Sequence, residues 1–145
     1  MPGRDAFIEI LRKNGLMVHI RRRRRYKTTD SNHHYRKYPN LIKDVAPQRP
    51  NEIWVSDITY IETDEGVCYL SLITDAYSHK IVGWALGSTL ETIYPLEALG
   101  MALDTIDDET ASRLIHHSDR GCQYCSDAYV SELKKHGVSI SMTQS

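Results

Sequence analysis

Long apolar runs are missing from this 145-residue sequence. No window approaches the roughly 18 apolar residues of a membrane-spanning helix, and the first residues, Met1 to Asp5, lack the apolar stretch of a secretory signal. With 41% hydrophobic and 26% charged residues, the composition is that of one ordinary globular domain with an appendage. We therefore expect an intracellular protein that resides in the cytoplasm.

Cysteine is scarce as well, with three residues in the chain. A small, odd number without an export signal argues against a disulfide framework. Cys122 and Cys125 have the spacing of half a zinc site, with His116 and His117 just upstream, but no second CxxC or spaced histidine pair completes it. Ordinary thiols are the favoured interpretation, and zinc is the alternative.

Charge is distributed unevenly between the two halves of the chain. Residues 1–50 carry 13 Lys and Arg against 4 Asp and Glu, a net charge of +9, whereas residues 51–145 carry 5 against 15, a net charge of -10. A basic arm beside an acidic body suits a protein that holds phosphates with one part and acts on them with the other. A solvated basic tail is the plainer alternative.

The basic half predicts an incomplete DNA-binding segment followed by a linker. Residues 5–14 have the pattern of a short amphipathic helix that ends before Gly15, and residues 39–50 contain three prolines and no clear period. We place the domain boundary near residue 50, with a second domain over 51–145. Phosphate contacts are expected from the following cations: Arg21, Arg22, Arg23, Arg24, Arg25, Lys27, Arg36 and Lys37. A nuclear-localisation signal is the alternative for the arginine run.

The acidic half predicts an α/β fold. Three β-rich runs joined by short loops indicate an antiparallel meander over 53–61, 67–74 and 80–86. A helix begins near residues 92–94 with Pro95 in its first turn. An acidic loop at 107–109 then leads to a strand ending at Asp119. A helix capped by Ser126 precedes a last strand over 138–142. Residues 88–91 have the pattern of a capping box, but Pro95 favours the later start of the first of these helices. The order β-β-β-α-β-α-β is that of the ribonuclease-H-like mixed sheet flanked by helices.

Two carboxylates interrupt apolar strands of this predicted sheet. Asp57 lies inside the run 53–61, which we expect to be buried, and Asp119 ends the stretch 114–119. In the predicted order the first and fourth strands are neighbours, so the two acids should face each other. Because a carboxylate held away from water is costly unless it is paired or binds a metal, this pair predicts a divalent-cation site.

Other polar residues near these strands have structural interpretations as well. Asp75 ends a strand before a turn, where aspartate commonly accepts hydrogen bonds from nearby backbone N–H groups, and a role near the metal is the alternative. His116 and His117 should point to opposite faces of their strand, each packed or facing solvent, and an approach of one of them to the active site is the alternative. Arg120 follows the second acid in a strand-to-helix connection, where binding residues often lie, and it is a further candidate for DNA contact.

Three sequence blocks resemble bacterial insertion-sequence transposases with a retroviral-integrase-like catalytic core. The blocks are Trp54 to Ile61, Asp75 to Trp84 and His117 to Tyr124. Four upstream segments resemble the same proteins just before their core: Gly3 to Asp5, the arginine run, Thr28 to His33 and Pro39 to Leu41. The resemblance covers nearly the whole chain. It implies cutting and joining of DNA by an Asp, Asp, Glu triad that holds two Mg²⁺ or Mn²⁺ ions, with Asp57 as the first acid and Asp119 as the second.

The resemblance has further implications for partners and for completeness. It implies double-stranded DNA as partner, a homo-oligomer when active, and association with the bacterial nucleoid. The family's glutamate lies on a helix farther beyond Asp119 than the 26 residues present, so we expect a core that lacks its last helix and has low or no activity alone. A catalytically inactive remnant that only binds DNA, or a ribonuclease-H-like nuclease, are the alternatives.

Overall fold

The computed structural model describes residues 3–16, 26–27 and 29–144. The arginine run over 21–25 lies outside the described residues. Helix α1 (Arg4–Lys13) confirms the predicted N-terminal helix, and Gly15 follows it with a positive φ of 66°. None of the α1 side chains is buried.

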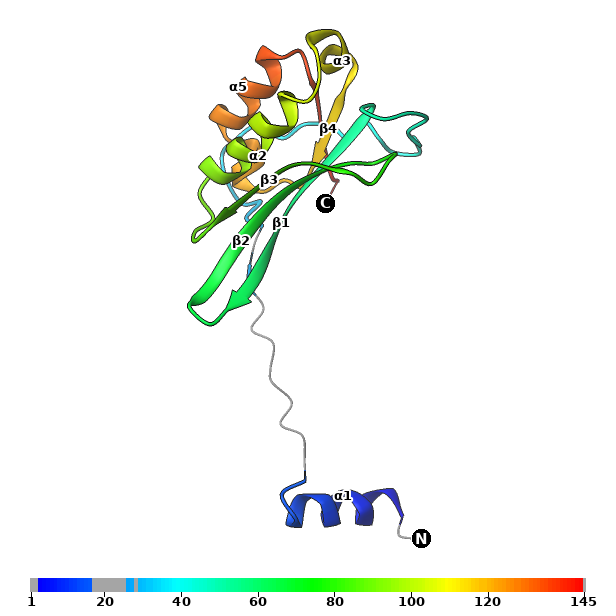
Figure 1. Cartoon of the computed structure of the whole chain (residues 1–145), viewed down its shortest axis with the longest axis vertical. Coiled ribbons are helices and arrows are strands. Elements are labelled where there is room, and N and C mark those ends of the chain that lie inside the picture. Colours follow the sequence, from blue (N-terminus) through cyan, green and yellow to red (C-terminus); the bar gives the residue numbers. More distant parts are fainter. Residues whose placement is uncertain (1–2, 17–25, 28, 145) are drawn as a thin grey trace.

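The centre of the fold is a mixed five-stranded sheet (Figure 1). Its strands lie in the order β3-β2-β1-β4-β5, where β1 pairs antiparallel with β2 and parallel with β4. The strand bounds are β1 (Ile53–Thr63), β2 (Gly66–Asp75), β3 (Ile81–Gly87), β4 (Ile115–Ser118) and β5 (Ser139–Met142). This arrangement confirms the predicted meander and the predicted contact between the first and fourth strands.

Two longer helices cover one face of the sheet and enclose the hydrophobic core. They are α2 (Ile93–Leu103) and α5 (Asp127–Lys135), and their buried side chains pack against Trp54, Ile58 and Ile73 of the sheet. Burial of large apolar side chains such as these, at roughly 25 cal/mol per Å², is the main force that holds the layers together. Figure 1 shows α2 alongside β3, at one edge of the sheet.

Some of the residues that begin and end these helices are the ones that the sequence predicts. Ser126 caps α5 by accepting a hydrogen bond from the Tyr129 backbone N–H, and Gly137 follows the helix with a φ of 72°, both as predicted. Pro95 lies in the first turn of α2, also as predicted. The helix begins at Ile93, which confirms the start predicted near residues 92–94, and the alternative start with a capping box at 88–91 is not adopted. The N-cap residue is Thr92, and its side chain accepts no capping hydrogen bond.

Two short helices were not predicted. They are α3 (Asp108–Arg113), in place of the acidic loop, and α4 (Cys122–Cys125), which directly precedes α5. Helices of six and four residues are too short to display a hydrophobic period. The Asp107 side chain, which accepts from the Thr110 backbone N–H, was the one local signal for α3.

Strand β1 is buried on one face only, which corrects the expectation of a fully buried run. Trp54, Ser56 and Ile58 are buried, whereas Val55 and Asp57 between them are exposed. Alternation of this kind is the rule for a strand whose sheet is covered by helices on a single side. Asp57 therefore lies on the open face of the sheet and not in the core.

A segment of the basic half lies against the acidic half of the chain, and we call residues 29–42 the strap. Its backbone accepts hydrogen bonds from Cys122 N at the Asp30 carbonyl (3.0 Å) and from Met142 N at the Pro39 carbonyl (3.2 Å). Tyr35 and Tyr38 pack against the core. The domain boundary near residue 50 stays a prediction, but the strap ties the two halves together at β5 and just after β4.

No helix within the described ranges has the length and apolar character needed to cross a membrane.

Candidate functional site

Asp57 is the first of the two acids and projects from the middle of β1. Its Oδ1 atom accepts a hydrogen bond from the backbone N–H of Ile58 at 2.9 Å. Although the residue is on the open face, partial burial of the carboxyl group raises the pKa of Asp57, and the negative charge of Asp119 raises it further. A negative charge on Asp57, next to that of Asp119, is therefore unfavourable in this fold.

Asp119 follows the end of β4 and has both oxygens engaged. Its Oδ1 atom accepts from the Gly121 backbone N–H at 2.8 Å, and its Oδ2 atom accepts from the Thr29 hydroxyl of the strap at 2.6 Å. A Cβ atom on Gly121 would lie 2.9 Å from Asp119 Oδ1, so the absence of a side chain lets the loop close on the carboxylate. No sequence pattern indicates that Thr29 is a neighbour of this acid, because 90 residues separate the two.

The register of β1 and β4 brings Asp57, on β1, level with Asp119, just after β4. Strands β1 and β4 pair in parallel, with Val55 opposite His117, so two residues farther along each chain come Asp57 and Asp119. Carboxylate oxygens are the ligands that Mg²⁺ prefers, usually with several waters and substrate phosphates completing its shell. Two neighbouring carboxylates that repel each other fit such an ion. Within the described residues, no group of three His, Cys, Asp or Glu side chains is placed to hold a metal.

A buried polar cluster supports the strands that carry the acids. His116 is fully buried, and its Nε2 atom lies 2.6 Å from Ser56 Oγ on β1 and 2.9 Å from the Tyr129 hydroxyl on α5. His117 Nδ1 lies 2.9 Å from Ser141 Oγ on β5. Both imidazoles are therefore packed, one of the two placements expected, and they connect β4 to its neighbours on either side.

This cluster predicts a specific pH dependence of stability. Burial lowers the pKa of His116 to about 3, and burial also lowers the pKa of His117. In the unfolded chain a histidine takes up a proton near pH 6.5, so the neutral folded form loses stability as the pH falls below that value. We expect the free energy of unfolding, measured with urea, to fall between pH 6.5 and 5 by up to about 1.4 kcal/mol per pH unit for His116 alone.

The control for this prediction is His116→Gln, which keeps polar atoms near the two hydroxyls but does not titrate. It should flatten the slope between pH 6.5 and 5 whatever its effect on stability at pH 7. A slope equal to that of the wild type in this variant would show that His116 is not the group responsible. Titration of the Asp57 carboxyl cannot account for a loss of stability at low pH. Its raised pKa makes the folded state more stable as the pH falls, which is opposite to the effect of His116.

Asp75 has a structural role, as expected from its position. It is 1% exposed and accepts hydrogen bonds from the backbone N–H groups of Asn51 (3.1 Å) and Ser78 (3.0 Å), and from the Ser78 hydroxyl. Burial alone would raise its pKa, but these donors hold the pKa of Asp75 below its ordinary value. Asp75 therefore fixes the turn after β2, beside the start of β1.

The cysteines near the second acid are packed thiols. Cys125 is buried with its Sγ atom 3.6 Å from Met142 Sδ, and burial raises the pKa of this thiol. Cys122 donates a hydrogen bond to Gln123 Oε1 at 3.4 Å. These contacts agree with the favoured interpretation of ordinary thiols.

The structure brings together two of the cations predicted to bind DNA. Lys37 of the strap and Arg120 of the loop after β4 line one small cavity beside Asp119. The other two described cations lie elsewhere on the strap and just before it: Lys27 pairs with Asp30 at 3.5 Å, and the Arg36 guanidinium lies 5.1 Å from the centre of the Tyr38 ring. DNA binding by all four residues stays a prediction, as it does for the run 21–25.

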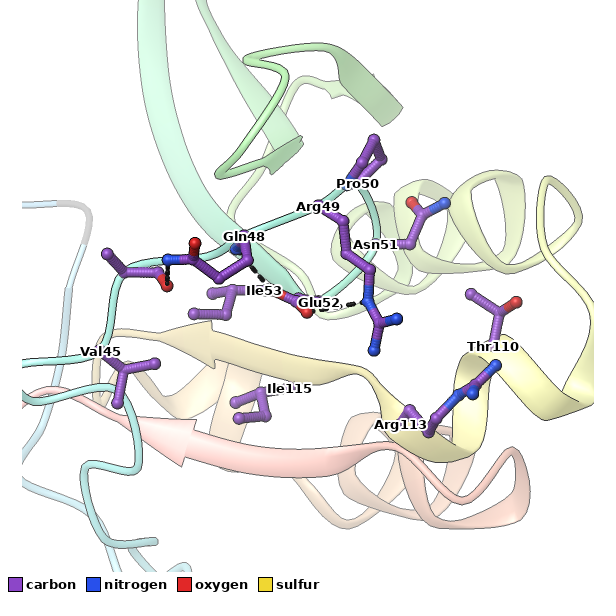
Figure 2. Close-up of a pocket in the computed structure, with 11 residues that line it drawn as sticks. Val45, Gln48, Arg49, Pro50, Asn51, Glu52, Ile53, Thr110, Arg113 and Ile115 are labelled. Atoms are coloured by element: carbon purple, nitrogen blue, oxygen red, sulfur yellow. Dashed lines mark hydrogen bonds and ion pairs between the residues drawn. The ribbon is translucent and has the colours of Figure 1, made fainter.

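A larger cavity, of about 510 Å³, lies at the other end of the sheet (Figure 2). Ile53 and Ile115, the first residues of β1 and β4, contribute to its wall, and Arg49 pairs with Glu52 at 2.9 Å beside them. The acids lie farther along the same two strands, toward or beyond their carboxyl ends. This cavity is therefore separate from the candidate site.

Residues 47–145, which include all five strands and both acids, match a known protein family described as "Integrase core domain". The chain belongs to the integrase core family. This match confirms the integrase-like core that the resemblance of the three sequence blocks predicted.

Relatives of this integrase core include several insertion-sequence proteins. It is 40% identical over 144 residues to "Insertion element IS600 uncharacterized 31 kDa protein" of Shigella sonnei, covering 98% of this chain and 52% of that protein. It is 38% identical over 103 residues to "Transposase InsF for insertion sequence IS3A" of Escherichia coli, covering 71% of this chain and 35% of that protein. The chain thus spans about half the length of the first relative and about a third of the second.

Solved structures support the fold of this integrase core. The catalytic core domain of the HTLV-2 integrase, in complex with magnesium and in a trimeric form, superposes with a TM-score of 0.57 at 15% identity, covering 68% of this chain and 63% of that one. At this identity the likeness concerns the fold alone, and it confirms the predicted ribonuclease-H-like α/β arrangement.

Proposed function

We propose that this integrase core takes part in DNA transposition, through cleavage of phosphodiester bonds at insertion-sequence ends and transfer of the cut strands. The proposal depends on one observation above all. By the parallel register of β1 and β4, Asp57 on β1 lies level with Asp119 just after β4. The pKa of Asp57 is raised, first by partial burial and then by the charge of Asp119. Relatives named as transposases support the choice of DNA as substrate.

In this proposal Asp57 and Asp119 hold a divalent cation, Mg²⁺ or Mn²⁺, and the intact family site holds two such ions. When bound, the ions supply Lewis-acid activation of the attacking oxygen and charge stabilisation of the leaving oxygen. The chain's own residues orient the ligands: Gly121 N and the Thr29 hydroxyl fix the Asp119 carboxylate, and Ile58 N fixes that of Asp57. Such supporting hydrogen bonds commonly contribute roughly 10- to 100-fold to metal affinity.

The expected partners follow from the same proposal. They are double-stranded DNA, as transposon ends and as target, and further copies of the chain, since two ends must be held together. Related integrase cores have been solved in trimeric and dimeric forms, which supports a homo-oligomer. The proposed place of action is the cytoplasm, on nucleoid DNA.

A cleavage assay tests the proposed function. Labelled duplexes that carry the ends of the insertion element would be incubated with the chain and Mg²⁺ or Mn²⁺, and strand cleavage and joining would be followed on denaturing gels. We expect activity to disappear in Asp57→Asn and in Asp119→Asn. The exposed acid Asp64 lies in the turn between β1 and β2, so Asp64→Asn is a matched control that should retain activity.

The same assay separates the alternatives retained from the sequence. Cleavage of an RNA–DNA hybrid without strand transfer of element ends would favour a ribonuclease-H-like nuclease. Binding of element ends without any metal-dependent cleavage would favour an inactive DNA-binding remnant. Cleavage of element ends that persists in both aspartate variants would overturn the assignment of the site.

The arginine run allows a separate prediction about DNA affinity. If residues 21–25 bind phosphates, replacing all five with glutamine should flatten the plot of log K against log salt by roughly 0.9 for each phosphate no longer neutralised, up to about 4 to 5 in total. Fluorescence anisotropy of a labelled duplex at several salt concentrations measures this slope. Lys135→Gln on α5 is the control and should leave the slope near that of the wild type. An unchanged slope in the five-arginine variant would remove this run from the DNA interface.

A further inference from the structure

A small cavity of about 180 Å³ opens directly beside the second acid. Three parts of the chain form it: the strap, the loop after β4 and the residue after β5. Its lining side chains are Thr29, Ser31, Lys37, Asp119, Arg120 and Thr143. Since a water molecule in the liquid takes up roughly 30 Å³, the space admits a group of several heavy atoms.

Hydrogen bonds between the three parts hold the cavity walls in place. The Thr143 backbone N–H donates to the Ser118 carbonyl at 3.0 Å, and Cys122 N donates to the Asp30 carbonyl at 3.0 Å. His33 Nε2 lies 2.9 Å from the carbonyl oxygen of Arg120. The cavity is thus preorganised by contacts to the main chain, which lowers the ordering cost of binding.

The chemistry of the lining selects an anion with several oxygens. Lys37 and Arg120 provide two positive charges, and no carboxylate among the described residues lies within ion-pair distance of the Lys37 ammonium. The remaining side chains, apart from Asp119, carry hydroxyl groups. A guanidinium, an ammonium and hydroxyls around a small space are the groups that contact phosphate oxygens in nucleic-acid complexes.

Exposure is graded across the cavity. Ser31, Lys37 and Thr143 are exposed, whereas Thr29, Asp119 and Arg120 are half-buried. The mouth can therefore admit a group carried by a long polymer, while the inner end lies against the acid.

We propose that this cavity is a subsite for one phosphate group of a DNA backbone, adjacent to the pair of acids. That the phosphate belongs to DNA rests on the proposed function, whereas the preference for phosphate rests on the lining itself. The subsite would place the sugar-phosphate chain next to Asp119, so that a neighbouring phosphodiester bond lies over the open face that carries Asp57.

The subsite should be coupled to metal binding at the acids. The carboxylate of Asp119 repels a phosphate in the cavity, and a cation held by Asp119 would cancel that repulsion. Binding linkage is reciprocal, so phosphate should in turn strengthen cation binding. The two ligands are therefore expected to bind with positive cooperativity.

An NMR titration of the full chain tests the subsite without relying on catalysis. The probe is the dinucleotide thymidylyl-thymidine, which carries a single phosphodiester, added to ¹⁵N-labelled protein with and without Mg²⁺. We expect amide shifts at Ser31, Lys37, Arg120 and Thr143, and tighter binding when Mg²⁺ is present. Lys37→Gln should weaken binding by about threefold to tenfold, as expected for the loss of one charge-assisted hydrogen bond.

Two further variants make the outcome decisive. Lys43→Gln, an exposed lysine just beyond the strap that does not line the cavity, should bind the dinucleotide like the wild type. Asp119→Asn should bind it more tightly than the wild type without Mg²⁺ and should lose the Mg²⁺ effect. Shifts at other surfaces only, equal losses in the two lysine variants, or weaker binding by Asp119→Asn would each overturn the subsite. Because cleavage is not measured, this result stands apart from success or failure of the transposition assay.

Discussion

Replacing Asp119 with asparagine is expected to abolish the stabilisation that Mn²⁺ or Mg²⁺ confers on this chain. In the wild type the folded state holds two neighbouring carboxylates, and partial burial together with the charge of Asp119 raises the pKa of Asp57. A cation that binds the folded state and not the unfolded state adds RT ln(1 + [L]/Kd) to the free energy of unfolding. At a cation concentration about one hundred times Kd this is about 2.7 kcal/mol, and it should vanish in the variant.

Thermal unfolding followed by circular dichroism measures this effect. For a chain of this length, about 2.7 kcal/mol corresponds to a rise in Tm of roughly 5 to 10 °C in the wild type. Asp57→Asn should also lose the rise, and without metal it should be slightly more stable than the wild type, because it removes a charge that folding disfavours. The control Asp64→Asn should keep the full rise. A metal-dependent rise of wild-type size in Asp119→Asn would place the ions elsewhere on the molecule.

The second large effect concerns the contact between β3 and α2. A Cβ atom built on Gly83 would lie 2.0 Å from the backbone oxygen of Ala98 and 3.0 Å from Ala102 Cβ. Because the first of these is a backbone atom of a packed helix, the strand and the helix would have to move apart. We expect Gly83→Ala to lower the free energy of unfolding by about 3 kcal/mol or more, measured by urea denaturation.

Two other glycines of the same region provide graded controls. A Cβ on Gly87 would lie 2.3 Å from the Tyr94 ring, which is a side chain that can rotate, so Gly87→Ala should cost less than Gly83→Ala. Gly100 lies inside α2, where an added Cβ atom would have nothing within 4 Å, so Gly100→Ala should stabilise the fold by about 0.5 to 1 kcal/mol. A Gly83→Ala variant as stable as the wild type would contradict the close packing of β3 on α2.

Sequence patterns were sufficient for the order of the main elements and for the pairing of the acids. The β-rich run around Tyr69 and the cap at Ser126 each depend on local chemistry, and both the strand and the helix are present. The proximity of Asp57 and Asp119 followed from topology, since a helical crossover brings the fourth strand beside the first. The order of the elements along the chain therefore predicted that two acids 62 residues apart lie close together, which no local sequence pattern indicates.

Other features could not be read from local pattern. Val55 and Ile61 are apolar but exposed, so the run that contains Asp57 looked more buried than it is. The hydrogen bond from Thr29 to Asp119 joins a polar strap with no periodicity to a loop 90 residues away. This bond depends on tertiary placement alone, and a sequence of prolines and charges gives no signal for it.

The strap also limits how far the chain can be divided into interchangeable modules. The family match begins at residue 47, but a fragment cut there would leave the backbone N–H groups of Cys122 and Met142 without their carbonyl acceptors and Asp119 without the Thr29 hydroxyl. Exchanging the basic half between relatives would likewise replace part of the wall around the second acid. The strap and the core are therefore expected to diversify together, with residues 29–42 inherited as a unit with the core.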